Sequence, residues 1–423
     1  MLDLKSLRED PEPVKTALSR RDPALSADVD RLLEADRRRR ELNVQVEELR
    51  AEQNRGSKAV SRATPGEREQ LIASLKEVSI RLDELQPQLA EADEAVTVLL
   101  GRLPNPPHDS VPVGETDEDN VVVREVGVPP AFGFEPKDHV DLGQALGVLD
   151  IDRATKVAGS RFAYLLGDAV WLQWALVRYC LDMLTPKGFV PVIPPVLVRE
   201  EAMFGTGFLP TDEANIYVTR DDELYLAGTS EVPLAGFHQG EILEPGGLPL
   251  RLVGYSTCFR REAGAYGKDT RGIFRVHQFD KVEMFSYTMP DASWEEHEFL
   301  LSCEEEIARG LGLPYRVVNV CTGDLGASAA KKYDIEGWLP GQQRYRELTS
   351  CSNCTDYQAR RLGTRVRLPE ANQPVHTLNG TACAVGRMLI ALLENHQQED
   401  GSVRVPDVLH PYLPEERRVL TGP

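Results

Sequence analysis

Two long heptad patterns near the N-terminus constrain the fold more than any other feature of this 423-residue chain. In both patterns apolar residues recur at spacings of three and four, which is typical of a helix that packs along one seam against another helix. The first seam lies within Ala27–Glu52 and keeps its register when Arg39 is counted in it: Leu32, Ala35, Leu42, Val46 and Leu49. The second seam follows at Leu71, Leu75, Val78, Leu82, Leu85, Leu89, Ala92, Val96 and Leu99.

Helix-breaking residues separate the two seams. Gly56, Ser57, Pro65 and Gly66 interrupt the pattern, so the sequence predicts an antiparallel helical hairpin with its tip in this segment. With about 28 to 30 residues in each leg, the hairpin should be roughly 40 to 45 Å long. Pro87 lies within the second leg, where it is expected to kink the helix or to remove one hydrogen bond.

Positive charge gathers on this hairpin although the chain as a whole has a net charge of −19. Residues 37–40 form a run of four arginines in the first leg, and a second group of cations surrounds the tip: Arg55, Lys58, Arg62 and Arg68. The acidic average excludes a general nucleic-acid coat, but a phosphate backbone would suit such a local excess. A dimerising coiled coil with a solvated surface explains the same pattern, so both interpretations stay open at this point.

A proline-rich segment follows the hairpin. Leu103–Pro112 contains four prolines in ten residues, which predicts an extended linker. We therefore expect an N-terminal domain at residues 1–103, a linker at 104–112 and a second domain at 113–423.

The second domain mixes helix and strand patterns. We predict strands at residues 121–126, 188–195, 224–227, 314–320 and 347–353, and helices at residues 168–184, 231–238, 294–308 and 388–396. Prolines stop the strand at 188–195, and a Gly-Arg pair at residues 386–387 precedes the last helix.

One segment of this domain, Thr257–Phe285, places a basic, glycine-containing loop between two strand patterns. Leu252–Phe259 predicts the first strand, and the apolar residues from Phe274 to Phe285 predict the second. Three glycines break the patterns between them, and five cations fall within sixteen residues: Arg260, Arg261, Lys268, Arg271 and Arg275. Such an excess favours a polyanionic ligand, although a hairpin with a solvated basic loop would look the same.

The seven cysteines and the absence of long apolar runs limit the setting of the protein. An odd number of dispersed cysteines favours reduced thiols and a cytoplasmic location. Cys351-x-x-Cys354 could be half of a zinc site or a redox pair, but no second pair completes it. The charged N-terminus argues against a signal peptide, and no apolar run of membrane-spanning length occurs.

The basic segment also carries a specific resemblance. The run F-R-x-E-A-G, D-T-R-G and R-x-H-Q-F-x-K-V-E, which begins at Phe259 and ends at Glu283, resembles motif 2 of class II aminoacyl-tRNA synthetases, and in particular that of bacterial-type seryl-tRNA synthetases. The helix and strand before Pro195 resemble motif 1, and Gly386-Arg387 before a helix resembles motif 3. Val403–Leu413 is similar to the closing segment of the family.

The resemblance implies an α+β fold, in which an antiparallel class II catalytic sheet follows an N-terminal coiled-coil arm. It implies ATP and Mg²⁺ as cofactors, L-serine as substrate and tRNA(Ser) as partner, and it leaves open whether tRNA(Sec) is charged as well. It further implies a homodimer, with Pro195 at the interface, and no membrane partner.

The resemblance also implies roles for single residues. Arg260 and Arg387 would be catalytic, on the α- and γ-phosphates, and Glu347 with Ser350 would hold Mg²⁺. The implied ATP-binding residues are Arg260, Arg261, Glu262, Val276, Phe279, Glu347, Ser350 and Arg387. The implied serine-binding residues are Thr229, Glu231, Arg260, Glu283, Asn379 and Thr381.

Two other functions compete with this interpretation. An amino-acid-activating paralogue that loads a carrier protein would resemble the catalytic core, but such relatives lack the arm and carry zinc ligands in the pocket. A non-catalytic coiled-coil adaptor would not need Arg260, Glu262, Glu347 and Arg387 together. The remaining loop cations, Lys268, Arg271 and Arg275, have no assigned role, and contact with the tRNA acceptor end is a hypothesis for them.

Overall fold

The computed structural model describes residues 1–264, 267 and 269–422. The chain divides into two compact units, Met1–Leu103 and Pro104–Pro423, each with its own hydrophobic clusters.

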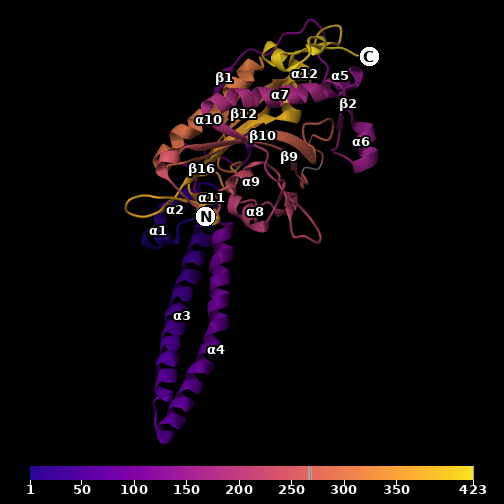
Figure 1. Cartoon of the computed structure of the whole chain (residues 1–423). Coiled ribbons are helices and arrows are strands. Elements are labelled where there is room, and N and C mark those ends of the chain that lie inside the picture. Colours follow the sequence, from indigo (N-terminus) through magenta and orange to yellow (C-terminus); the bar gives the residue numbers. More distant parts are fainter. Residues whose placement is uncertain (265–266, 268, 423) are drawn as a thin grey trace. The chain divides into compact units, whose positions relative to one another are not determined.

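The first unit is the predicted helical hairpin on a small helical base. Two short helices, α1 (Leu4–Glu9) and α2 (Glu12–Ser19), precede the long helices α3 (Ala24–Val60) and α4 (Pro65–Arg102). The long helices lie side by side and run in opposite directions (Figure 1). One apolar cluster, which includes Leu7, Leu32 and Val96, joins the base, and a second joins the two legs halfway along. The arm expected from the heptad seams is confirmed.

The turn at the tip lies within the predicted segment but is shorter than predicted, and the legs are longer. α3 continues through Gly56 and Ser57, and a Cβ on Gly56 would come within 2.6 Å of the Leu75 side chain, so this glycine permits close helix packing. The legs have 37 and 38 residues, which corresponds to about 55 Å at 1.5 Å per residue. α4 also continues through Pro87, which lacks the N–H for one helical hydrogen bond.

The predicted breaker Pro65 in fact begins the second leg. Thr64 caps α4, because its side chain accepts from the Glu67 backbone while the Glu67 carboxylate accepts from the backbone and hydroxyl of Thr64. Proline is well suited to the first helical position, where no N–H is needed. The turn between the legs is therefore limited to residues 61–64.

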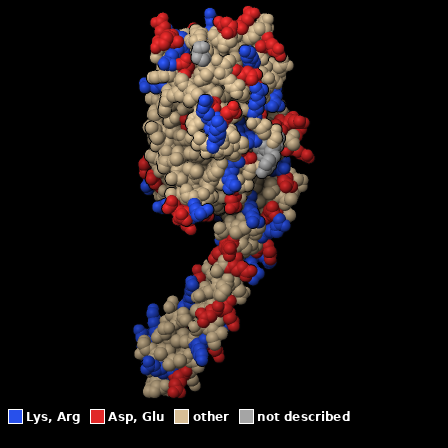
Figure 2. All heavy atoms as spheres, turned by 90° about the vertical axis from the view of Figure 1, so that its right-hand side faces the viewer, with Lys and Arg blue, Asp and Glu red and all other residues tan. Residues whose placement is uncertain are grey.

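The two groups of arm cations differ in their surroundings. Arg37 pairs with Glu34, and Arg39 and Arg40 pair with the buried Asp36. Most of the predicted basic run is thus neutralised within its own helix. The four tip cations Arg55, Lys58, Arg62 and Arg68 are exposed, and none of them forms an ion pair with any described residue. Figure 2 shows basic and acidic side chains interleaved along the arm, with basic ones near its free end.

The second unit is built on an eight-stranded sheet, ordered β1-β11-β12-β13-β16-β10-β9-β4. Every neighbouring pair is antiparallel except β4 and β9, which run parallel. Across the sheet, in the same order, the strands are Val121–Val126, Tyr315–Asn319, Lys331–Leu339, Arg344–Asn353, His376–Ala384, Gln278–Thr288, Leu250–Phe259 and Phe189–Val192. The predicted α+β class with an antiparallel sheet is confirmed.

Helices cover both faces of this sheet. Neighbouring residues of a strand point to opposite faces, so the strands contribute apolar side chains to both layers of helices. Val282 and Met284 belong to the main core, together with α7 (Asp168–Leu184), α10 (Ser293–Gly310) and α12 (Val385–Asn395). Phe285 and Tyr287 point the other way, into a second cluster with α9 (Glu231–Ala235) and α11 (Tyr357–Leu362). Figure 1 shows α7 and α10 crossing the strands and α9 on their other side.

The remaining elements are short and lie at the margins of the sheet. The helices are α5 (His139–Ala145), α6 (Ile151–Ala158) and α8 (Glu200–Thr206). Short strand pairs and triplets are formed by β2 (Leu149–Asp150) with β3 (Tyr164–Leu165), β5 (Leu197–Val198) with β7 (Tyr225–Leu226) and β6 (Tyr217–Val218), β8 (Ile242–Leu243) with β14 (Arg365–Val366) and β15 (Gln373–Pro374), and β17 (Val403–Arg404) with β18 (Val419–Leu420). None of the described helices is long and apolar enough to cross a membrane.

Several predicted boundaries in this unit are wrong. β4 ends at Val192 instead of residue 195, and β13 begins at Arg344 instead of residue 347. β10 begins at Gln278 instead of Phe274, because the Ile273 and His277 amides donate to His139 and Arg161 and not to a neighbouring strand. α9 ends at Ala235 and does not reach His238. α12 begins at Val385, so Gly386 and Arg387 stand in its first turn.

Candidate active site

A cavity of about 380 Å³ opens on the sheet at β10, β12, β13 and β16. Side chains from Phe208 to Arg387, far apart in sequence, meet in its lining. Every predicted site residue except Arg261 lines it: Thr229, Glu231, Arg260, Glu262, Val276, Phe279, Glu283, Glu347, Ser350, Asn379, Thr381 and Arg387.

A register shift brings Glu347 and Ser350 to this one cavity. Glu347 and Ser350 are three positions apart, so on a regular strand their side chains would point to opposite faces of the sheet. β13 shifts register against β12 between Glu347 and Thr349, so that one extra residue is accommodated and the facing pattern resets. A similar shift between β10 and β16 lies beside Thr381.

The two principal arginines are held by backbone oxygens and partners from other elements. Arg260 donates from Nε to the Gly228 carbonyl at 3.1 Å, and its guanidinium carbon is 5.3 Å from the centroid of the Phe279 ring. Arg387 donates from Nη1 to the Glu347 carbonyl at 2.9 Å. Both side chains thus present permanently charged donors to the cavity before any ligand is bound.

Glu262 stands in an unusual backbone conformation. Its φ is +51°, a left-handed value that costs a non-glycine residue free energy and is frequent at functional sites. Arg275 donates to its carboxylate at 2.8 Å. This pair gives Arg275, which had no role in the sequence, a definite partner within the cavity.

At the other end of the cavity, Glu231 is buried among polar partners. Its Oε1 accepts from Gln358 Nε2 at 2.7 Å and from Asn379 Nδ2 at 3.0 Å. Burial, with the negative charge of Glu283 in addition, raises the pKa of Glu231 to about 7. A ligand ammonium group would offset this burial and favour the ionised carboxylate.

Glu283 is also buried, and its partners occupy one of its two oxygens. Lys281 lies 2.5 Å from Oε2, and Thr381 donates its hydroxyl to the same atom at 3.2 Å. Gly254 lies directly opposite on β9, where a Cβ would come within 3.0 Å of Ser230 and Leu234. This glycine lets α9, which carries Glu231, lie close to the sheet.

Glu347 carries the charge that a metal ion would need. Burial opposes its ionisation, but Arg387 and Lys332 outweigh that effect and hold the pKa of Glu347 below its usual range. The described residues contain no group of three or more His, Cys, Asp or Glu side chains arranged around a metal. One carboxylate and one hydroxyl nevertheless suit Mg²⁺, which keeps several waters and takes its other ligands from substrate phosphates.

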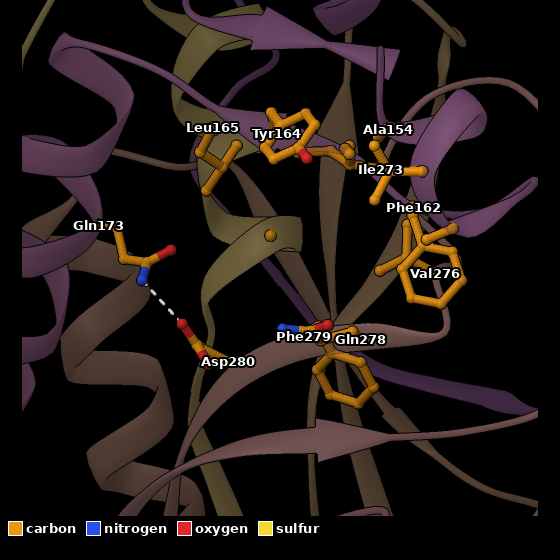
Figure 3. Close-up of a pocket in the computed structure, with 14 residues that line it drawn as sticks. Ala154, Phe162, Tyr164, Leu165, Gln173, Ile273, Val276, Gln278, Phe279 and Asp280 are labelled. Carbon is orange, nitrogen blue, oxygen red and sulfur yellow. Dashed lines mark hydrogen bonds between the residues drawn. The ribbon is translucent and has the colours of Figure 1, made fainter. Parts of the chain in front are cut away.

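A second cavity, of about 370 Å³, adjoins the first. Ile273, Val276, Phe279 and Gly386 line both cavities. Figure 3 shows this hollow bordered by Tyr164 and Phe162 on one side and by Asp280, which accepts from Gln173, on the other. Its lining is largely apolar, so the convergent charged groups belong to the first cavity.

The structure does not bring every predicted cation to the site. Arg261 is exposed outside the cavity lining, and its guanidinium carbon is 5.8 Å from the Tyr217 ring centroid. Arg271 pairs with Asp138 and Asp141 at the start of α5. Lys268 lies outside the described residues.

Sequence reasoning missed two residues that the fold makes important to the cavity, of which Lys281 lines it. Lys281 is two residues from Glu283 on β10, so strand alternation could have placed both on one face. Gln358, which fixes Glu231, lies 127 residues away in sequence, and no local pattern reveals it.

The Cys351-x-x-Cys354 pair belongs to the interior and not to a zinc or redox site. Both thiols are fully buried, and burial raises the pKa of each well above its ordinary value. Cys354 Sγ accepts from Asn379 Nδ2 at 3.6 Å. A protonated, inaccessible thiol neither binds zinc readily nor exchanges disulfides.

Comparisons with known proteins agree with this geometry. Residues 1–107 match the model of the seryl-tRNA synthetase N-terminal domain, and residues 216–396 match that of the tRNA synthetase class II core domain (G, H, P, S and T). The chain is 51% identical to serine–tRNA ligase 1 of Streptomyces avermitilis, over 98% of this chain and 97% of that one.

Solved structures give the same result. The chain is similar to the seryl-tRNA synthetase of Pyrococcus horikoshii complexed with ATP, with a TM-score of 0.92 and 45% identity over 100% of both chains. It is also similar to the cytoplasmic serine–tRNA ligase of Naegleria fowleri in complex with AMP, with a TM-score of 0.83 and 36% identity over 95% of this chain and 94% of that one. From its arm to its catalytic sheet, the chain belongs to the seryl-tRNA synthetase family of class II aminoacyl-tRNA synthetases.

Proposed function

We propose that the protein activates L-serine with ATP as seryl-adenylate and transfers the serine to tRNA(Ser). The observation that carries this proposal is the single cavity whose lining brings together Arg260 and Arg387 with the buried carboxylates of Glu231 and Glu283. Relatives that are about half identical to this chain over nearly its full length are named serine–tRNA ligases.

The ATP end of the cavity follows from the placement of its charges. Arg260 would bind the α-phosphate and stabilise the charge that develops when the serine carboxylate attacks. Arg387 would bind the γ-phosphate, and Phe279 would stack on the adenine ring, with Glu262 and the backbone near Val276 at the edge of the base. The attacking carboxylate is already a nucleophile, so catalysis rests on orientation and on these preorganised cations.

Mg²⁺ would be held by Glu347 and Ser350 together with the phosphates of ATP. Bound there, the ion would neutralise phosphate charge and orient the leaving pyrophosphate. The lowered pKa of Glu347 supports the assignment, since a metal ligand must be ionised.

The serine end is defined by two carboxylates. Thr229 and Glu231 would bind the ammonium group, and Glu283 would accept a hydrogen bond from the serine hydroxyl through the oxygen that Lys281 and Thr381 leave available. Asn379 steadies Glu231 from β16. Alanine would leave Glu283 buried without its partner, which should cost far more than the loss of one hydrogen bond.

The arm would bind tRNA(Ser) through its exposed tip cations. Arg55, Lys58, Arg62 and Arg68 face solvent, which suits a phosphate backbone. We propose tRNA(Ser) as the main partner, and charging of tRNA(Sec) is a separate outcome that the same assay would detect. The arm also argues against the carrier-protein alternative, whose members lack it.

A homodimer would cover an exposed apolar surface on α7 and β4. Trp171, Trp174, Val190 and Ile193 are between 47% and 86% exposed, and all lie in the segment that resembles motif 1. Large exposed apolar side chains of this kind mark protein interfaces. Sedimentation should show a dimer for the native chain and a monomer for Trp174→Glu, and a native monomer would refute this assignment.

A cytoplasmic location is consistent with the seven free thiols.

Pyrophosphate exchange with each of the twenty amino acids tests the reaction and the substrate together. We expect serine to support exchange and alanine to be rejected by about 10³-fold or more, because Glu283 would lose its partner. Equal exchange with alanine or glycine would refute the serine assignment. No exchange with any amino acid would refute activation itself.

A further inference from the structure

The segment that returns from the basic loop to β10 lines the ATP end of the cavity without being part of the sheet. We call residues 269–277 the return segment. Ile273, Phe274, Arg275 and Val276 all line the cavity, yet β10 begins only at Gln278. Strand pairing therefore cannot hold these residues in place, and other contacts must do so.

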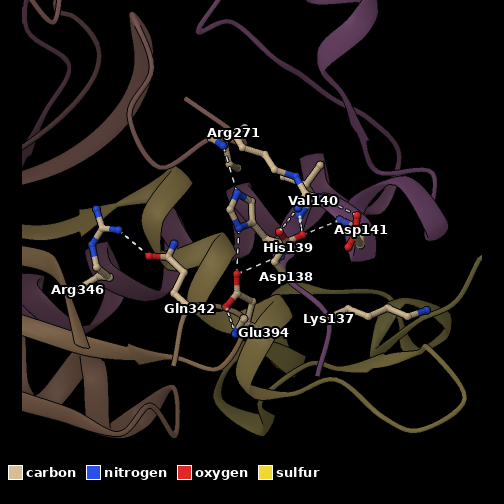
Figure 4. A network of polar contacts seen from close by, with 12 residues as sticks. Lys137, Asp138, His139, Val140, Asp141, Arg271, Gln342, Arg346 and Glu394 are labelled. Carbon is tan, nitrogen blue, oxygen red and sulfur yellow. Dashed lines mark hydrogen bonds and ion pairs between the residues drawn. The ribbon is translucent and has the colours of Figure 1, made fainter. Parts of the chain in front are cut away.

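His139 on α5 provides one such contact. The Ile273 N–H donates to His139 Nε2 at 3.2 Å, and His139 Nδ1 lies 3.0 Å from Glu394 Oε1. Since Nε2 accepts, the proton of a neutral imidazole resides on Nδ1 and is donated to Glu394. Both side chains are at least 96% buried, and Figure 4 shows the ring between the carboxylate and the return segment.

Glu394 fixes the position of that ring. Its Oε1 also accepts from the His139 N–H at 3.0 Å, and its Oε2 accepts from the Gly341 N–H at 2.9 Å. Glu394 stands on α12, the helix whose first turn carries Arg387. One buried carboxylate thus links the arginine helix, α5 and the return segment.

Two glycines adapt the return segment to this arrangement. Gly272 has a φ of +86°, and a Cβ on it would come within 2.0 Å of His139 Nε2. A Cβ on Gly386 would come within 3.6 Å of the Ile273 carbonyl oxygen. The Ile273 peptide therefore lies between the imidazole and the start of α12, where little displacement is possible.

Phe274, the next residue, connects the position of Ile273 with the arginines of the ATP site. The Phe274 ring lies beneath two guanidinium groups, with Arg346 at 3.9 Å and Arg387 at 4.6 Å from its centroid. Arg346 in turn binds Asp269, at the start of the return segment, at 2.9 and 2.6 Å. A shift of Ile273 would move Phe274, and with it the surface against which Arg387 is held.

We propose that His139 and Glu394 are positioning residues for ATP. Their hydrogen-bonded chain, Glu394 to His139 to the Ile273 N–H, sets the return segment and so aligns Arg387 and Arg275 for the nucleotide. The inference rests on the proposed assignment of Arg387 to ATP. Neither residue lines the cavity, so both act through the backbone of the return segment.

Two substitutions of His139, with side chains of different length, distinguish the positioning role from a general effect on stability. His139→Gln can place an amide oxygen near the position of Nε2 and retain the bond from Ile273. His139→Asn is shorter and can satisfy Glu394 but not reach the Ile273 N–H. In both variants Glu394 keeps its two backbone donors, the N–H groups of residue 139 and Gly341.

Pyrophosphate exchange, with ATP and serine varied in turn, gives the readout. For His139→Asn we expect the KM for ATP to rise by about tenfold or more and kcat to fall, with the KM for serine within about twofold of native. His139→Gln should recover most of the ATP affinity. His396→Leu is the control, because it removes a different histidine, part-buried at the end of α12 and bonded to the Leu311 carbonyl, without touching the return segment.

The outcomes distinguish the possibilities. Equal effects of Asn and Gln, or equal rises in both KM values, would overturn the positioning role, as would an ATP effect of the same size in His396→Leu. If His139→Asn is too unstable to assay, Glu394→Gln takes its place, because its amide cannot accept from both His139 and Gly341. Its KM for ATP should rise more than its KM for serine, and equal rises would overturn the positioning role. Failure of the proposed function would appear separately, as absence of serine-dependent exchange in the native protein.

Discussion

The arm and the catalytic cavity both contain groups of arginines, but the two units hold them differently. In the arm, Arg37, Arg39 and Arg40 pair with acids three or four residues away on the same helix. In the cavity, Arg260 and Arg387 are held by the Gly228 and Glu347 carbonyls, 32 and 40 residues away. Local pairs neutralise charge within a helix, whereas the long-range carbonyl contacts fix each guanidinium in the cavity lining, where Arg387 also pairs with the Glu347 carboxylate at 3.3 Å.

This difference has an energetic consequence. Exposed pairs on a helix contribute little to stability and are screened by salt. A guanidinium that is already oriented in a partly buried cavity needs no reorganisation when charge develops on a phosphate. We therefore expect substitutions in the cavity to have large effects on rate, and substitutions on the arm to have smaller, salt-dependent effects on tRNA affinity.

The largest effect of a single substitution should come from Arg260→Ala. Adenylate formation, measured by pyrophosphate exchange, should fall by about 10³-fold because a preorganised cation at the α-phosphate is lost. The free energy of unfolding should change by only about 1 kcal/mol, since one hydrogen bond to the Gly228 carbonyl is removed.

Arg261→Ala is the matched control for that substitution. Its side chain lies outside the cavity lining, so exchange should change by no more than about threefold. Equal losses for the two arginines, or unfolding of Arg260→Ala at room temperature, would contradict the distinction between them.

A smaller effect should appear in the pH dependence of serine binding. The pKa of Glu231 is raised to about 7, so the carboxyl is protonated below that pH and must lose its proton to bind an ammonium group. The KM for serine should therefore be about tenfold higher at pH 6 than at pH 8, with ATP saturating.

Glu231→Gln tests the origin of this pH dependence. It should raise the KM for serine at every pH and flatten the profile, because the titrating group is absent. A native KM that does not change between pH 6 and pH 8 would show that Glu231 stays ionised in the free enzyme.

The smallest effects should come from the arm. Replacing Arg55, Lys58, Arg62 or Arg68 singly by Gln should raise the KM for tRNA by a few-fold and reduce the salt dependence of binding by about one phosphate contact. Arg37→Gln, whose partner Glu34 is on the same helix, should have less effect. If Arg37→Gln weakened tRNA binding as much as the tip variants, the tip would not be the contact surface.

The sequence predicted elements best where periodicity alone defines them. Val121–Val126 and Asp168–Leu184 have the predicted bounds residue for residue, because a valine-rich run defines the first and a helical period the second. The tip of the arm lies in the predicted segment, but Pro65 was interpreted as a breaker although the Thr64–Glu67 capping box makes it a helix start. Chemically specific caps can therefore override the average preference of a residue type.

The candidate site was predictable only as far as the resemblance reached. Motif residues meet in one cavity, but the register shift that turns Glu347 and Ser350 to the same face has no local signal. The contacts of Glu231 with Gln358 and of Ile273 with His139 span more than 120 residues each. Such contacts depend on the completed sheet and its helices, which no periodicity describes.

We propose that the second unit activates serine by itself, and that the arm contributes only the binding of tRNA. Deleting Glu41–Glu91 and joining the legs with a short glycine linker keeps the apolar cluster at the base of the arm, including Leu32 and Val96. Both activities should then be measured on the same preparation. For the deletion variant we expect serine-dependent pyrophosphate exchange within about twofold of the full chain and no detectable aminoacylation of tRNA(Ser). Equal loss of both activities, or aminoacylation that survives the deletion, would contradict it.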